Sequence, residues 1–212
     1  SVAENVAVVG TYDGTDADAA DTMAYTIRTF GENSASVDHD LFSVVSGTGV
    51  LTFGSAPDFE APGCGASDDS NTCVVVLMAS DGTNSDTITV TVTVTAVNDN
   101  TPVFDDDDSD GESSTAAASV AENVAAVGTY DGTDADVADT MTYTILTTGA
   151  SVDNDLFSIV GGTGVLTFST APNYEAPGCG SGNNANVCVV VLRISDGTNT
   201  DDITVTVTVT NT

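Results

Sequence analysis

The sequence has almost no positive charge. Its 212 residues include 32 acidic side chains but only two arginines, one histidine and no lysine, which gives a formal net charge of −30. Because nucleic acids and anionic membrane surfaces attract proteins through Lys and Arg, neither is an expected partner. Two carboxylates about 4 Å apart repel by about 1 kcal/mol in water and by about 4 kcal/mol at an effective dielectric of about 20. Clustered acids therefore either face open water or hold cations, and a solvated surface is expected for most of them.

The sequence also lacks tryptophan and any long apolar run. No stretch reaches the roughly 20 apolar residues of a membrane-spanning helix, and no basic segment precedes an apolar one as in a signal peptide. Direct membrane insertion is therefore not expected. A chain that begins at Ser1 without Met is interpreted as mature or excised.

The chain consists of two nearly identical copies of one sequence. Glu4 recurs as Glu122 within the same SVAEN motif, and Cys64 recurs as Cys179. Each copy holds roughly 95 residues, a normal size for a domain with its own core. The expected division is a first repeat at 1–104, an acidic linker at 105–118 and a second repeat at 119–212.

Each copy is predicted to be an all-β sandwich. Short alternating runs are separated by turn signals, and nothing recurs at helical spacing. In the last strand of copy one, the alternation predicts that Ile88, Val90, Val92 and Val94 face inward while threonines face outward. Seven strands with regular turns in this length predict a seven-stranded, immunoglobulin-like Greek-key sandwich, present twice in tandem. The strands expected in copy one include Val6–Tyr12, Thr22–Arg28, Leu41–Val45, Gly49–Phe53, Cys73–Ser80 and Asp86–Thr95.

The four cysteines form one closely spaced pair in each copy, Cys64/Cys73 and Cys179/Cys188. Even numbers, local spacing and an acidic composition predict two disulfides within domains and an oxidising, extracellular compartment. Closing so short a loop would contribute roughly 2–3 kcal/mol by the chain-entropy model. Zinc is the alternative, although the spacing matches no common zinc pattern and His39 is the only histidine.

Between the two copies lies an oxygen-rich connector. Asn98, Asp99 and Asn100 follow the last strand of copy one, and Pro102 keeps Thr101 extended. A stiff connector with carboxylate and amide oxygens and no cationic side chain suits a hard cation such as calcium. The acidic run that follows, with Asp106, Asp108 and Asp110 before Gly111, matches only the opening of a calcium loop, so a flexible solvated linker is the alternative there.

Five motifs occur in a fixed order in copy one, and four of them recur in the same order in copy two, two of these with substitutions. They are Ala-Glu-Asn at 3–5, Asp-Ala-Asp at 16–18, Asp-Phe-Glu at 58–60, Ala-Ser-Asp-Gly at 79–82 and Val-Asn-Asp-Asn-x-Pro-x-Phe at 97–104. In this order the motifs resemble a cadherin repeat, and the run from Gly49 to Asn84 more closely resembles bacterial cadherin-like repeats. The resemblance covers nearly all of the chain outside 105–118.

The resemblance implies calcium ions between successive repeats, held by ligands from both. Transferred by motif, copy one would supply Glu4, Asp58 and Glu60, the connector Asn98, Asp99 and Asn100, and copy two Asp134, Asp136 and Asp196. Ligands from two domains would fix their relative orientation when the ion binds.

The sequence departs from the family pattern at several positions. Ala96 stands where the family usually has an acid, Asn173 replaces Asp58 in copy two, and the linker carries about seven extra residues. Half-sites are expected at the two ends of the chain. They comprise Asp16, Asp18 and Asp81 at the start and Glu122, Glu175 and Asn211 at the finish.

These features predict an extracellular, calcium-dependent structural or adhesive protein, secreted or on a cell surface. Complementary half-sites favour head-to-tail or homophilic association with copies of itself, and contacts of that kind that do not close produce filaments. An excerpt from a longer covalent array of repeats would present the same half-sites.

The sequence gives less support to two other functions. A polysaccharide-binding module is the alternative, although Tyr12, Tyr25, Tyr130 and Tyr143 lie in strand patterns typical of a core rather than of an exposed platform. Catalysis is not expected, because His39 is replaced by Asn154 in copy two and no general base is repeated.

Overall fold

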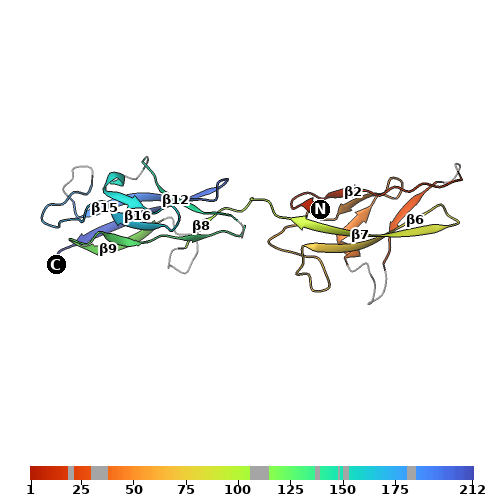
Figure 1. The fold of residues 1–212 in the computed structure, drawn as a ribbon, viewed down its shortest axis with the longest axis horizontal. Helices are drawn as coiled ribbons and strands as arrows, with labels where there is room; N and C mark the ends of the chain where they lie inside the picture. Colours follow the sequence, from red (N-terminus) through yellow and green to blue (C-terminus); the bar gives the residue numbers. More distant parts are fainter. Residues whose placement is uncertain are drawn as a thin grey trace. The chain divides into compact units, whose positions relative to one another are not determined.

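The computed structural model describes residues 1–18, 22–29, 38–105, 115–136, 139–147, 149, 153–180 and 185–212. The chain divides into two compact units, Ser1–Val97 and Asn98–Thr212. Both are built almost entirely from β-strands (Figure 1), and the helical elements described are the single turns η1 (His39–Leu41) and η2 (Asn154–Leu156). No helix in the described part of the chain is long and apolar enough to cross a membrane.

The first unit is a sandwich of two sheets. One sheet has the strand order β1-β7-β6-β3 and the other the order β2-β5-β4. Residues from both sheets form its core, including Leu51 and Phe53 from one and Val75 and Val92 from the other. The strands are β1 (Val2–Ala3), β2 (Val8–Thr11), β3 (Ala24–Ile27), β4 (Phe42–Val44), β5 (Val50–Phe53), β6 (Thr72–Ser80) and β7 (Ser85–Thr95).

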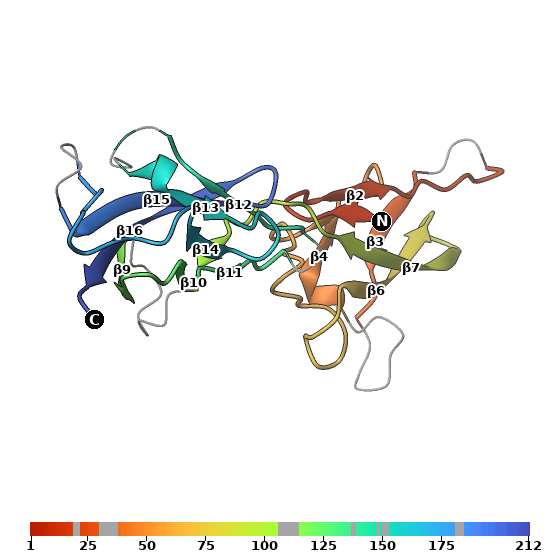
Figure 2. The ribbon, with the colours of Figure 1, turned by 60° about the vertical axis from the view of Figure 1, so that its left-hand side comes forward.

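The second unit repeats this sandwich and adds strands at its beginning (Figure 2). Its sheets have the orders β12-β15-β16-β9 and β10-β14-β13, with a separate pair β11-β8. Its first long strand, β9, runs parallel to its last strand, β16, over seven residue pairs. The strands are β8 (Val103–Phe104), β9 (Thr115–Ala121), β10 (Ala126–Thr129), β11 (Gly132–Thr133), β12 (Thr142–Ile145), β13 (Phe157–Ile159), β14 (Val165–Phe168), β15 (Val187–Ser195) and β16 (Thr200–Thr210).

The all-β prediction of two tandem sandwiches is confirmed. The division between the units, however, lies before Asn98, whereas the sequence was expected to divide into 1–104, 105–118 and 119–212. Backbone pairing accounts for the difference, because Val103–Phe104 pairs with Gly132–Thr133 and strand β9 already begins at Thr115. The connector and the end of the expected linker are thus part of the second unit.

One face of each last strand is buried, as the alternation of threonine and valine predicts. Val90, Val92 and Val94 are at most 6% exposed, and the threonines between them are exposed. Ile88 lies in phase with these valines, beside Tyr25 and Leu77, but it is not buried, because the residue is 52% exposed. Its counterpart Ile203 is 1% exposed and packs in the core that contains Phe104 of β8. In the described part of the first unit, no strand equivalent to β8 covers Ile88.

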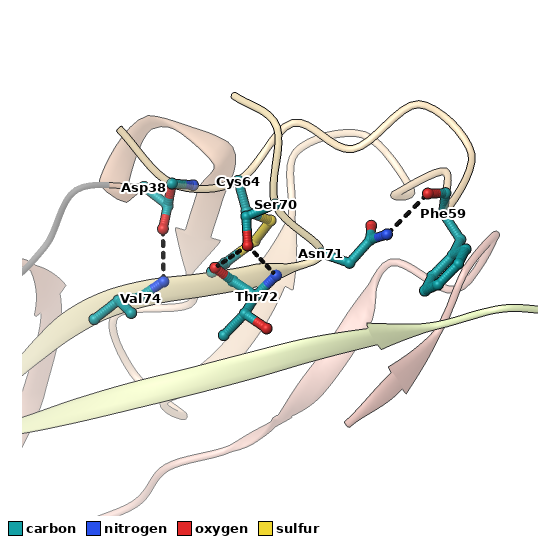
Figure 3. The surroundings of a disulfide bond; sticks show 9 residues. Asp38, Phe59, Cys64, Ser70, Asn71, Thr72 and Val74 are labelled. Carbon is teal, nitrogen blue, oxygen red and sulfur yellow. Dashed lines mark hydrogen bonds between the residues drawn. A yellow bond between two sulfur atoms is a disulfide. The ribbon is translucent and has the colours of Figure 1, made fainter. Parts of the chain in front are cut away.

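Both expected disulfides are present, Cys64–Cys73 and Cys179–Cys188, and no described cysteine remains free to hold zinc. Beside the first disulfide the buried carboxylate of Asp38 accepts two backbone hydrogen bonds, of which Figure 3 shows the one from Val74. Its Oδ1 accepts from Gly65 N at 2.6 Å and its Oδ2 from Val74 N at 2.6 Å. Asp38 thus ties the disulfide loop to strand β6.

Candidate cation-binding site

In the first unit, Glu4 joins three segments of the chain. Its Oε1 accepts a hydrogen bond from Val97 N at 2.6 Å and its Oε2 from Phe59 N at 2.8 Å, and the residue is 2% exposed. The next residue, Asn5, has φ 62°, a left-handed conformation that Asn tolerates better than most residues. The Ala-Glu-Asn motif therefore turns the chain sharply and directs the Glu4 carboxylate inward.

Glu60 lies beside Glu4, and Asp58 forms the turn that carries it. A carboxylate oxygen of Glu60 lies within 4.8 Å of one of Glu4. Asp58 Oδ1 accepts hydrogen bonds from Glu60 N and Ala61 N, both at 3.1 Å. In the second unit Asn173 Oδ1 accepts from Glu175 N at 3.0 Å in the same way. The replacement of Asp58 by Asn173 thus keeps the turn, because an amide oxygen can accept the same bond.

In the second unit, the side chain of Asp136 binds the backbone of the connector. Asp136 Oδ2 accepts hydrogen bonds from Asp99 N at 3.1 Å and Asn100 N at 2.9 Å. Its Oδ1 accepts a further bond from Asn100 Nδ2 at 3.2 Å, and the residue is 5% exposed. A carboxylate oxygen of Asp99 also lies within 4.8 Å of one of Asp136. The structure therefore brings together the predicted residues Asp99, Asn100 and Asp136.

Two residues that the sequence analysis did not identify also bind the connector. Asn199 Nδ2 donates to the carbonyl oxygen of Asn100 at 2.6 Å, and Asn98 Nδ2 donates to Asp139 Oδ2. A signal for both was present in the repeat, because Asn199 recurs as Asn84 and Asp139 recurs as Asp21. Asn199 lies two residues after the Ser-Asp-Gly motif of copy two, and Asp139 lies three residues after its Asp-Ala-Asp motif.

Asp134 and Asp196 each keep one buried oxygen without a hydrogen-bond partner. Asp134 Oδ1 accepts from Asp136 N at 2.9 Å, and Asp196 Oδ1 accepts from Thr198 N and Asn199 N, both at 2.6 Å. Within the described residues, Asp134 Oδ2 and Asp196 Oδ2 are buried and receive no hydrogen bond. Buried polar atoms are normally paired, so two such oxygens in one unit require another explanation.

Hydrogen bonding keeps Asp196 ionised. Burial alone would raise its pKa, but the amides of Thr198 and Asn199, which donate to Oδ1, lower the pKa below its ordinary value. Its Oδ2 therefore carries negative charge in the neutral pH range. A hard cation would satisfy that oxygen, and carboxylate and carbonyl oxygens are the ligands that calcium prefers.

The remaining predicted residues lie away from the connector. In the first unit, Asp16 and Asp81 line one pocket at the start of β7, whereas Glu4 contacts the end of this strand. Asp18 N donates to Asp16 Oδ1 at 2.7 Å. Asp81 Oδ1 accepts from Thr83 N at 2.6 Å and Asn84 N at 2.5 Å, and these amides, Asn84 first, lower the pKa of Asp81.

At the end of β16, Glu122 and Glu175 repeat the arrangement of Glu4 and Glu60. Glu122 accepts hydrogen bonds from Tyr174 N at 3.2 Å and Thr212 N at 3.3 Å, and these amides lower its pKa. Glu175 Oε1 accepts from Asn211 Nδ2 at 3.1 Å. The partial calcium-loop motif Asp106–Asp110 lies outside the described residues.

No family model matches the chain, and no curated protein matches it. Solved structures do match. Human protocadherin-24 EC1-2 has a TM-score of 0.70 and 19% identity, with 100% of this chain and 93% of that chain covered. Human CDH23 EC21-23 has a TM-score of 0.67 and 18% identity, with 96% of this chain and 68% of that one covered. Drosophila N-cadherin EC1-4 has a TM-score of 0.63 and 18% identity, with 91% and 42% covered.

The chain has the fold of tandem cadherin repeats. The resemblance inferred from the five motifs is confirmed at the level of the fold. The connector Asn98–Asn100 joins the two cadherin-like repeats in sequence. In the second repeat it is held by Asp136, Asp139 and Asn199.

Proposed function

We propose that this protein is an extracellular structural or adhesive protein whose cadherin-like repeats are made rigid by calcium at the connector. The observation that carries the proposal is the pair of buried oxygens, Asp134 Oδ2 and Asp196 Oδ2, that lack hydrogen-bond donors among the described residues. Both belong to the same unit as a connector whose backbone is already fixed by Asp136. The two disulfides agree with an extracellular location, because disulfides persist in oxidising compartments.

In this proposal each repeat contributes a preformed part of the ligand set. The first repeat offers the close carboxylates of Glu4 and Glu60, and the second offers Asp99, Asp134, Asp136 and Asp196, with Asn98 and Asn100 as further oxygen donors. Asp58 acts mainly by forming the turn that carries Glu60. Shared ions would remove the repulsion among these carboxylates and fix one repeat against the next.

The same chemistry is proposed for the residues at the chain's two ends. Asp16, Asp18 and Asp81 would supply one half-site, and Glu122, Glu175 and Asn211 the other. Each would be completed by a neighbouring repeat or by a second copy of the chain, in head-to-tail association.

Calcium titration of the full chain by calorimetry tests the proposal. We expect saturable binding with dissociation constants of about 10⁻⁴–10⁻³ M, the range of extracellular modules. Asp134→Asn removes one unpartnered charged oxygen and should weaken the binding at least tenfold. Asp155→Asn, at an exposed position on η2, is the matched control and should leave the affinity unchanged. Absence of calcium binding by the wild-type chain at millimolar concentration would contradict the proposal.

A further inference from the structure

Side-chain amides form a hydrogen-bond network around the connector in the second unit. Asn98 Nδ2 donates to Asp139 Oδ2, and Asn100 Nδ2 donates to Asp136 Oδ1 at 3.2 Å and to Asp99 Oδ1 at 3.1 Å. The NH₂ group of an amide offers two N–H donors and no formal charge. In a chain with no lysine and two arginines, these amides supply donors that carboxylates often find in cationic side chains.

Asn199 contributes a further amide from outside the connector. Its Nδ2 donates to the carbonyl oxygen of Asn100 at 2.6 Å and lies 3.5 Å from Asn98 Oδ1. Both oxygens belong to residues of the proposed ligand set. The NH₂ group of Asn199 therefore contacts oxygens that the proposed function assigns to a cation.

The counterpart of Asn199 in the first unit makes a different contact. Asn84 Nδ2 donates to Asp81 Oδ2 at 3.4 Å, within its own loop. In the second unit the equivalent oxygen is Asp196 Oδ2, which is buried and receives no hydrogen bond from the described residues. An asparagine at this position can thus bind either its own aspartate or the connector. In the second unit it binds the connector, and the aspartate oxygen is left without a donor.

We propose that the side-chain amide of Asn199 takes the place of a cation in the calcium-free protein and leaves the connector oxygens when calcium binds. The inference rests on the proposed function. The partly positive N–H groups of Asn199 would be repelled by a divalent charge shared between Asp196 Oδ2 and the connector oxygens. A contact made only in the calcium-free state opposes calcium binding by its own free energy. Asn199 therefore keeps the connector bound to the second unit without calcium, and it lowers the calcium affinity.

Replacing Asn199 removes this contact and keeps the backbone hydrogen bonds of its loop. Asn199 N donates to Asp196 Oδ1 at 2.6 Å, and the Asn199 carbonyl oxygen accepts from Ser195 Oγ at 3.1 Å. Both bonds involve the backbone of residue 199 and remain possible in Asn199→Ala. The matched control is Asn84→Ala, which removes the counterpart amide from the first unit.

The first measurement is amide hydrogen exchange of the full chain, followed by NMR in the presence of a chelator. The amides of Asp99 and Asn100, which Asp136 accepts, should exchange roughly three- to tenfold faster in Asn199→Ala than in wild type, because one hydrogen bond to the connector is lost. Saturating calcium should abolish the difference. Asn84→Ala should exchange like wild type at these two amides.

The second measurement is a calcium titration of the same three proteins, followed by the chemical shift of the Asn100 amide. Asn199→Ala should bind calcium roughly three- to tenfold more tightly than wild type, because no amide has to leave the connector oxygens. The direction is opposite to that expected for Asp134→Asn, which removes a charged oxygen. Asn84→Ala should titrate like wild type at this amide.

Two results would overturn the inference. One is calcium binding at the connector that is equal or weaker in Asn199→Ala, since the amide would then not compete with the cation. The other is equal exchange of the Asp99 and Asn100 amides in Asn199→Ala and wild type in the chelator. Neither result touches the proposed function as long as wild type binds calcium. If wild type binds none, the proposed function and the competition both fail, whereas the exchange rates still decide whether Asn199 holds the connector.

Discussion

At the scale of single residues, the buried acids of this acidic chain are organisers of the backbone. Five are buried among the described residues, and each accepts two backbone N–H bonds from segments elsewhere in its unit. They are Glu4, Asp38, Glu122, Asp136 and Asp153. Charged acceptors form stronger hydrogen bonds than neutral ones, so a buried carboxylate in such a place stabilises the fold.

The two hydrogen bonds that Asp38 accepts allow a direct test of this stabilisation. Asp38→Asn leaves one acceptor oxygen and places an amide NH₂ against either Gly65 N or Val74 N, so one donor loses its partner. We expect a loss of about 2 kcal/mol in the free energy of unfolding, measured with urea. Asp40→Asn, exposed on η1, is the control and should change stability by less than about 0.5 kcal/mol. Equal effects of the two substitutions would show that the double acceptor does not stabilise the fold.

The lowered pKa of Glu122 predicts that the stability of the fold depends on pH. The amides of Tyr174 and Thr212 lower its pKa from the ordinary value of 4.5, so the folded state binds the proton less readily than the unfolded state. Its stabilising contribution is therefore present above about pH 4.5 and is lost as the pH falls through the lowered value. Wild type should be more stable than Glu122→Gln at pH 7, and the difference should shrink below about pH 4. Urea denaturation at several pH values measures this, and a difference that does not vary with pH would contradict it.

The sequence predicted part of the candidate site, through the order of its motifs. The repeated motifs led to Asp99, Asn100 and Asp136, which do lie together. They did not lead to Asp139 and Asn199, because both hold the connector through contacts formed only after distant loops meet. Nor did they distinguish a carboxylate that forms a turn, such as Asp58, from one with an unpartnered oxygen, such as Asp134. That distinction depends on the direction of each side chain.

At the scale of elements, alternation of threonine with valine predicted the last strand, and a continuous apolar run predicted the strand before it. The expected Cys73–Ser80 and Asp86–Thr95 differ by one residue from β6 and β7. Alternation did not predict the exposure of Ile88. It indicates the face of the sheet on which a residue lies, but not whether another strand covers that part of the sheet. The sequence also gave no sign that Thr115–Ala118 would extend a strand, since alanine is a poor strand former and nothing there alternates.

The parallel pairing of β9 with β16 predicts unequal effects of proline in the two repeats. Thr206 faces Ala117 of β9, whereas its counterpart Thr91 lies on the open edge of β7. Thr206→Pro should remove a ladder hydrogen bond and destabilise its unit by about 1–3 kcal/mol more than Thr91→Pro destabilises the other. Hydrogen exchange of the β15–β16 and β6–β7 segments follows the two units separately. Equal exchange in the two variants would indicate that β9 contributes little to stability.

At the scale of the whole molecule, charge repulsion opposes folding. The ion pair Arg193–Asp202 stands against a formal net charge of −30. In the presence of a chelator, raising NaCl from about 0.05 to about 0.5 M should increase the melting temperature by several degrees, because salt weakens the repulsion among exposed carboxylates. This increase corresponds to a stabilisation on the order of 1 kcal/mol. Calcium should reduce this salt effect. A melting temperature that falls with added NaCl would contradict the expectation.

The seven-pair contact between β9 and β16 also bears on mechanical behaviour. These two strands lie near the beginning and end of the second unit and run in the same direction, so a pull on the two ends of that unit loads their hydrogen bonds together, in shear. In the first unit the corresponding strands share only two residue pairs. Under tension the first unit of this chain, as its described strands pair, should therefore yield before the second.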